Sequence, residues 1–274
     1  MSWHGWSVQP PLLYVAVGAL LYWVGGRGYH GRPYTRWEEA SFAAGLVLIV
    51  LALESPLDAY ADRLFWVHMV QHIVLLTWAP PLILLGRPWP RMWRGIPLRW
   101  RTSIGRALAR ERWTAPVRLL AHPLAAVIVF NGSIVFWHLR FAFNATLTNG
   151  FVHDVEHAMF FFCGLLFWAR VIDPGPLRPR LVWPMRLAFV VCSMIVSWVI
   201  AVILATSLVP LYPAYAHLTH LPGGLTPLAD QQIAGGIMWV PGSFAYGVTI
   251  LAGVYRWLEP GSRSRGAGGV VTTG

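Results

Sequence analysis

The chain has 274 residues, of which 56% are hydrophobic and only 12% are charged, whereas a soluble domain usually has about 25% charged residues. Apolar runs of about 20 residues recur along its length, which excludes a soluble globular protein and predicts an all-α integral membrane protein. The formal net charge of +10 comes from 21 arginines without any lysine, and their clustering between apolar runs suits anionic lipid headgroups rather than a nucleic acid.

Seven apolar segments are predicted to be transmembrane helices. Residues 1–258 therefore read as one seven-helix transmembrane domain, and the Gly-, Ser- and Arg-rich tail 259–274 is expected to be disordered and cytoplasmic. In chain order the seven segments lie at about residues 11–24, 37–53, 63–87, 122–141, 151–172, 186–209 and 230–257.

The arginines also predict how this domain is oriented. With the N-terminus outside, every arginine except Arg63 and Arg140 falls in an inner loop or in the tail. Cytoplasmic loops collect positive residues, so we expect the N-terminus outside and the C-terminus in the cytoplasm. The basic segment 86–121 interleaves arginines with residues such as Trp93 and Trp100, which is typical of an amphipathic stretch lying on the inner membrane surface.

Histidine pairs mark the third and fifth segments. His68 and His72 are four residues apart, which places both imidazoles on one helical face, and His153 and His157 repeat this spacing. Ionisable residues inside a membrane are costly, usually face the bundle interior and mark functional sites. A single membrane histidine can instead be an interhelix hydrogen bond, and this bland interpretation applies best to His138.

The polar residues of four segments fall at one depth. At about 1.5 Å per residue, His68 and His72 lie roughly 7 and 13 Å below the outer end of their segment, while His153 and His157 lie roughly 3 and 9 Å below theirs. His138, near the outer end of the fourth segment, and the polar start of the seventh segment are at the same level. We therefore expect one polar chamber in the outer third of the membrane.

A chamber rich in imidazole predicts a metal site, because imidazole binds copper, zinc, iron and nickel. Nearby thioethers favour Cu(I), so copper is the expected metal, with iron or zinc as the other options. In the outer loop, His217 and His220 are either solvated or entry ligands. The predicted ligands are His68, His72, His138, His153, His157 and Asp230, with Gln231, Asp154, Glu156, Met69 and Met238 as outer-sphere or auxiliary groups.

Three stretches together resemble one family. They are HMVQHIVLLTWAPPLILLGRP, the WH of the fourth segment followed by HDVEHAMFFFCGLLFW, and DQQIAGGIMWVPG. In this order they are similar to the polytopic CtaG-type cytochrome c oxidase assembly factors, which are distinct from the single-span copper chaperone of the same name. The resemblance extends over about residues 37–257. Its matching polar positions are His68, His72, His138, His153, His157, Asp230 and Gln231.

The resemblance implies a multi-pass protein of the bacterial plasma membrane that serves the respiratory chain. Such a protein would act in cytochrome c oxidase assembly, at the copper-insertion step, with oxidase subunits as partners and no catalysis of its own. Two other functions fit the same histidines. One is a di-iron or haem-dependent membrane metalloenzyme. The other is a metal transporter, which is disfavoured because the inner parts of the segments show no continuing polar path.

Overall fold

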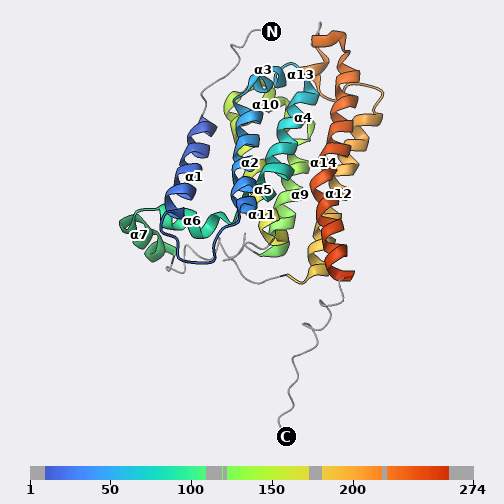
Figure 1. Cartoon of the computed structure of the whole chain (residues 1–274). Helices are drawn as coiled ribbons and strands as arrows, with labels where there is room; N and C mark the ends of the chain where they lie inside the picture. The colour runs from blue at the N-terminus through green and yellow to red at the C-terminus, as the bar shows by residue number, and fades with distance from the viewer. Residues whose placement is uncertain (1–9, 109–118, 120–121, 173–180, 218–220, 259–274) are drawn as a thin grey trace.

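The computed structural model describes residues 10–108, 119, 122–172, 181–217 and 221–258, and every regular element in these ranges is a helix (Figure 1). The all-α prediction is therefore confirmed. In chain order the elements are α1 (Pro10–Gly26), α2 (Arg36–Leu53), α3 (Pro56–Ala61), α4 (Phe65–Ile73), η1 (Val74–Trp78), α5 (Ala79–Leu85), α6 (Pro88–Gly95), α7 (Leu98–Leu108), α9 (Pro123–Trp137), α10 (Arg140–Thr148), α11 (Gly150–Ile172), α12 (Trp183–Thr206), α13 (Pro213–Ala216), η2 (Pro222–Gly224) and α14 (Pro227–Leu258).

Each of the seven predicted segments is helical in this structure. Four helical stretches are long and apolar enough to cross a membrane, namely Phe65–Leu85, α11, α12 and α14. The pair α9 and α10 makes a fifth candidate, although it bends by 71° between them, and α1 is an apolar helix of shorter length. The chain is thus a membrane protein by the length and composition of its helices.

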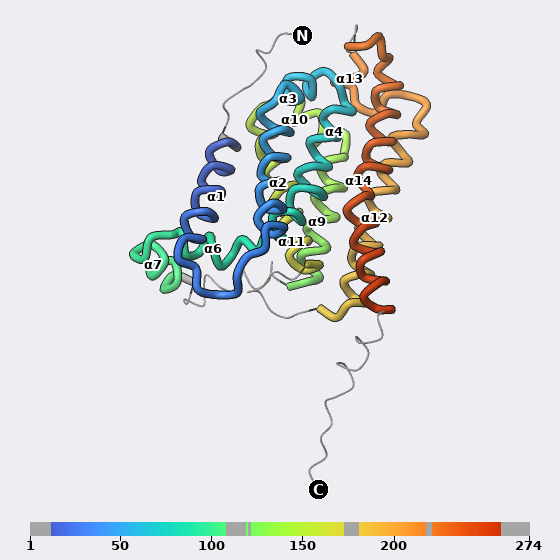
Figure 2. Tube along the Cα trace, in the orientation of Figure 1, coloured from blue at the N-terminus to red at the C-terminus, as the bar shows by residue number. Residues whose placement is uncertain are grey.

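The stretch Phe65–Leu85 is the most enclosed of the candidate spans, with 78% of its apolar window buried. Figure 2 shows it between α2 on one side and α14 on the other. Its first half, α4, carries His68 and His72, and its second half, α5, packs against α2, where Ser41 donates a 2.8 Å hydrogen bond to the carbonyl of Leu82.

A π turn, η1, joins α4 to α5. Its signature is the hydrogen bond from the Ala79 N–H to the Val74 carbonyl, five residues earlier. Pro80 follows directly and has no N–H to donate, so the carbonyl of Leu76 is left without its ordinary helical partner. The indole of Trp168 on α11 donates to that carbonyl at 3.1 Å. The helix is thus interrupted before Pro80 by a π turn that a neighbouring helix stabilises.

The first part of the basic segment packs on the bundle. α6 runs across the lower end of α1 and α2 in Figure 1, and the guanidinium of Arg91 lies 2.7 Å from Glu39 and 3.7 Å from the centre of the Tyr34 ring. α7 exposes Leu98, Trp100 and Ile104, as a membrane-surface helix would. Residues 109–118, 120–121 and the tail 259–274 lie outside the described part of the chain.

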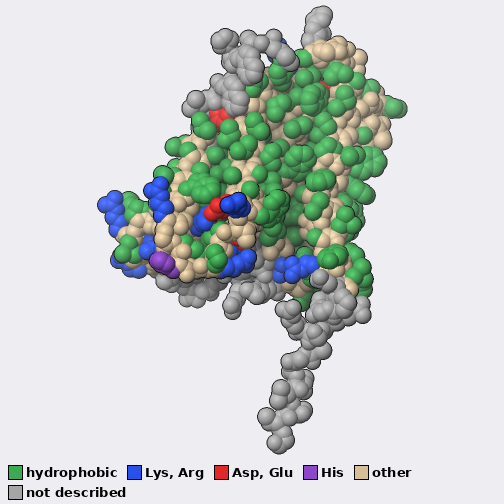
Figure 3. All heavy atoms as spheres, viewed as in Figure 1, with side chains coloured by type: hydrophobic (Ala, Val, Ile, Leu, Met, Phe, Trp, Pro, Cys, Tyr) green, Lys and Arg blue, Asp and Glu red, His purple; other side chains and the backbone are tan. Residues whose placement is uncertain are grey.

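The surface of the bundle is apolar along its length and basic at one end (Figure 3). Figure 3 shows hydrophobic side chains along the length of the bundle and arginine side chains gathered at its lower end. Many large apolar side chains on α1, α12 and α14 are exposed, for example Leu20 at 61%, Val199 at 55% and Leu251 at 71%. Such a surface is suited to acyl chains rather than to water.

Candidate metal centre

Helices α4 and α11 bring the two histidine pairs together. The ring centroids of His68 and His72 are 4.3 Å apart, and those of His153 and His157 are 4.1 Å apart. Between the helices, the His68 ring lies 5.0 Å from the His153 ring and 5.9 Å from the His157 ring. The two pairs thus form one cluster rather than two separate interhelix contacts.

Glu156 lies at the centre of this cluster. One of its carboxylate oxygens is 3.3 Å from Nε2 of His68 and 3.5 Å from Nε2 of His72, and the side chain is completely buried. The sequence alone predicts only an auxiliary role for Glu156. Its position three residues after His153 places both on the same face of α11, and this spacing was the available signal for a central role.

Four residues could share one ion. His68, His153, Glu156 and His157 each offer one ligand atom, and these atoms all lie within 4.8 Å of one another. Metal–nitrogen and metal–oxygen bonds of about 2.0–2.2 Å would place ligand atoms about 3–4 Å apart. A small inward movement of the side chains would therefore be enough to close the site around a metal.

Many polar atoms of the cluster make no hydrogen bond to any of the described residues. Nε2 of all five predicted histidine ligands and both oxygens of Glu156 are buried without a hydrogen-bond partner. A buried polar group without a hydrogen-bond partner costs about 1–3 kcal/mol. The presence of several such atoms in one cluster therefore calls for an explanation such as a bound ion. This donor set fits a first-row transition metal.

His138 approaches the cluster from the end of α9. Its ring centroid lies 6.1 Å from that of His72, and its Nδ1 lies 2.8 Å from the carbonyl oxygen of Ile134. Only a protonated Nδ1 can donate to that carbonyl, so Nε2 keeps its lone pair, which is the arrangement seen when imidazole binds a metal.

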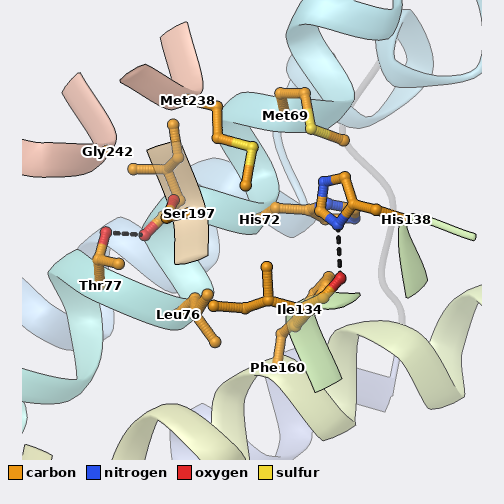
Figure 4. Close-up of a pocket in the computed structure, with 11 residues that line it drawn as sticks. Met69, His72, Leu76, Thr77, Ile134, His138, Phe160, Ser197, Met238 and Gly242 are labelled. Atoms are coloured by element: carbon orange, nitrogen blue, oxygen red, sulfur yellow. Dashed lines mark hydrogen bonds between the residues drawn. The ribbon is translucent and has the colours of Figure 1, made fainter. Parts of the chain in front are cut away.

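A small cavity separates His138 from two methionines. Its volume is about 20 Å³, close to the space that one water molecule needs. Figure 4 shows Met69 and Met238 on the same side of this cavity as each other, with His72 and His138 beside them. Both methionines are almost fully buried, whereas Met159 is 37% exposed. The cavity thus places two thioethers next to two imidazoles.

Asp230 and Gln231 make different contacts from the other predicted residues. The carboxylate of Asp230 accepts hydrogen bonds from the N–H groups of Phe65 and Trp66 at 2.8 and 3.1 Å, which caps the start of α4. Gln231 accepts a hydrogen bond from the Leu211 N–H and donates to the carbonyl of Leu204. Both residues therefore fix the helices around the cluster instead of pointing an unpaired atom into it.

Two of the remaining candidates have exposed side chains. Asp154 is exposed although it neighbours His153 in the chain, and His217 is exposed in the loop before η2. His220 lies outside the described residues.

Comparison with known proteins shows the family to which the chain belongs. The family model described as cytochrome c oxidase caa3 assembly factor, Caa3_CtaG, matches residues 20–259, which include every residue of the cluster. The chain belongs to the Caa3_CtaG family. The resemblance stated from the three sequence stretches is thereby confirmed.

The curated relatives of this Caa3_CtaG chain are mycobacterial proteins without a described function. An uncharacterized protein of Mycobacterium bovis and one of Mycobacterium tuberculosis are each 27% identical over 231 residues, and one of Mycobacterium leprae is 26% identical. The match covers 81% of this chain and 34% of each relative, so the chain spans about a third of their length. No solved structure matches the chain.

Proposed function

We propose that this chain binds copper in the cluster of His68, His72, His153, His157 and Glu156 and supplies it during assembly of a haem–copper oxidase. The observation that carries the proposal is the set of buried imidazole nitrogens and carboxylate oxygens that lie close together and make no hydrogen bond to the described residues. Membership of the Caa3_CtaG family supports the oxidase as the recipient.

The charge of the cluster favours Cu(I). Glu156 is a carboxylate that is completely buried among imidazoles, and burying an uncompensated charge is costly. A monovalent ion would neutralise it. Imidazole nitrogens and the thioethers of Met69 and Met238 are ligands that Cu(I) accepts, whereas zinc and iron have less use for thioethers.

Each group has a distinct proposed role. His68, His153, His157 and Glu156 hold the ion, and His72 and His138 extend the site toward the cavity of Met69 and Met238. Asp230 acts through the start of α4, which it holds in place, rather than as a ligand.

Delivery would occur by exchange of ligands without electron transfer. A bond from copper to an imidazole nitrogen breaks as a bond to a ligand of the acceptor forms, so copper keeps its oxidation state throughout. His153 is half-buried, while His68 is fully buried, so His153 is the proposed point of exchange. With seven spans and the N-terminus outside, as the arginines predict, this exchange takes place near the outer face of the bacterial plasma membrane.

Metal analysis of detergent-purified protein tests the proposal. Wild-type protein loaded with Cu(I) should retain one or two copper ions per chain, and His68→Ala/His72→Ala should retain none. His217→Ala, which removes an exposed histidine, is the matched control and should bind like wild type. Equal copper retention by the double variant and the control would sink the proposal.

The position of Glu156 also supports a second candidate, a dinuclear metalloenzyme. A buried carboxylate beside two pairs of histidines also suits a dinuclear centre. Absorption spectra of the same preparations separate the two functions. A ferric charge-transfer or Soret band in protein purified without added metal would favour the enzyme, and a colourless Cu(I) protein would favour the assembly factor.

A further inference from the structure

A second and much larger space lies at the arginine-rich end of the bundle. It is a groove of about 870 Å³ between η1, α5 and the end of α11 on one side and α12 and α14 on the other. Its size falls in the range of about 300–1,000 Å³ that is typical of ligand sites. Figure 2 shows α12 and α14 running side by side as a pair along one flank of the bundle.

The walls of the groove are apolar. Leu82 and Leu85 line it from α5, and Phe244 and Val248 line it from α14. Three of these side chains are well exposed, with Leu85 at 43%, Phe244 at 68% and Val248 at 51%. Open apolar walls in a membrane protein are suited to hydrocarbon chains that enter from the side.

One end of the groove carries two positive charges. Arg186 lies in the first turn of α12 and Arg256 in the last turn of the antiparallel α14, so both reach the same end. Their guanidinium groups lie 5.5 and 5.8 Å from the ring centre of Trp183. Arginine pairs recognise phosphate groups, and tryptophan prefers the boundary between headgroups and acyl chains.

The opposite end of the groove reaches the metal cavity. Thr77 of η1 lines both spaces, and next to it the indole of Trp78 donates a 3.1 Å hydrogen bond to the carbonyl of Pro241. The groove thus runs from the two arginines to the π turn that follows the histidines of α4. There it adjoins the small cavity of Met69 and Met238, here called the metal cavity.

We propose that this groove is a binding site for an anionic phospholipid of the leaflet at the arginine-rich end. The phosphate pairs with Arg186 and Arg256, and the acyl chains fill the groove up to Thr77, where they close the metal cavity on that side. The chain's own tail is a poorer occupant, because it carries Arg263 and Arg265 against one acid, Glu259. The proposal does not depend on the function of the histidine cluster.

Native mass spectrometry of the detergent-purified full chain tests it, with phosphatidylglycerol and phosphatidylcholine of identical acyl chains as probes. Wild-type protein should retain one phosphatidylglycerol in preference to phosphatidylcholine. Arg186→Gln/Arg256→Gln should bind it at least about tenfold more weakly, because the loss of one charge-assisted hydrogen bond alone has that effect. Arg99→Gln/Arg106→Gln removes the same charge from the exposed face of α7 and should bind like wild type.

Two further variants keep the test valid if the double variant does not fold, since Arg186 also donates to the carbonyls of Leu181 and Val171. Arg256→Gln should weaken phosphatidylglycerol binding, and Ala252→Trp should block the groove and abolish retention. Both should keep the wild-type copper content, so that failure of the lipid site and of the metal site can be told apart. The proposal would be overturned by equal retention of the two lipids or by unchanged lipid binding in both variants. It would also be overturned if the mass spectrum showed a bound tetrapyrrole in place of a lipid, or a dimer of the chain without bound lipid.

Discussion

The carboxylate of Glu156 lies 3.3 Å from Nε2 of His68, and both side chains are shielded from solvent. This contact joins α11 to α4 at the level where the other histidines converge. Because a buried charge needs either a cation or strong hydrogen bonds, the contact defines where a metal would have the largest effect on the protein.

Replacing Glu156 tests this relationship. Glu156→Gln keeps the size of the side chain and removes its charge, so the affinity for Cu(I) should fall by at least about 10–100-fold, the loss that accompanies removal of even an outer-sphere partner. Competition with a chromophoric Cu(I) chelator measures this. Asp154→Asn makes the same change at the exposed carboxylate two residues earlier and should leave the affinity unchanged. Equal affinities in the two variants would remove Glu156 from the site.

The methionines of the small cavity give a second prediction. Met69→Leu and Met238→Leu conserve volume and should cost less than about 1.5 kcal/mol of stability, but each should weaken Cu(I) binding. Met159→Leu changes an exposed methionine and is the matched control. X-ray absorption of the copper-loaded protein should show a sulfur scatterer that is lost in Met69→Leu/Met238→Leu. A spectrum with nitrogen and oxygen ligands alone in wild type would exclude the thioethers.

A third prediction concerns whether Asp230 caps α4 or binds the metal. Asp230→Asn should lower the free energy of unfolding of the metal-free protein by about 1–2 kcal/mol, because the amide has one acceptor oxygen for the two N–H groups and leaves the other N–H unpaired. Thermal unfolding in detergent without metal measures this, with exposed Asp62→Asn as the control. Full stability of metal-free Asp230→Asn together with loss of copper would instead make Asp230 a ligand.

Gly164 tests the contact between α11 and the π turn. A Cβ at this position would lie 2.8 Å from the carbonyl oxygen of Leu76, so Gly164→Ala should push α11 away from η1 and destabilise the protein by about 1–3 kcal/mol. Gly132 on α9 has open space at its Cβ, and Gly132→Ala should be neutral or stabilising. Unfolding midpoints of the two variants in the same detergent decide the matter, and similar midpoints would contradict the close approach.

Much of the architecture could be predicted from sequence because hydrophobic length is a strong signal in membrane proteins. All seven apolar segments are helical, and the two HxxxH pairs face each other, as the cost of burying imidazole in lipid requires. Depth counted from the segment ends also placed His138 at the level of His72, whose ring centroids prove to be 6.1 Å apart.

The individual contacts were less predictable, since they depend on helix rotation and on helix ends. A carboxylate such as Asp230 can ligate a metal or cap a helix equally well by composition, and only the position of α4 relative to α14 separates the two. Met69 neighbours His68 in the chain but precedes His72 by three residues, and Met69 and His72 therefore line the same small cavity. The 71° bend between α9 and α10 was likewise hard to predict, because no proline lies at the bend.

The π turn at residues 74–78 changes how this helix should be compared with its relatives. One extra residue in a turn rotates everything after it by about 100° relative to an uninterrupted α-helix. The phase of the side chains before Val74 therefore does not predict the phase of those after Trp78. Where a relative lacks the extra residue of the π turn, an alignment with that relative needs a one-residue gap between the histidines of α4 and the prolines of α5 to match both in space.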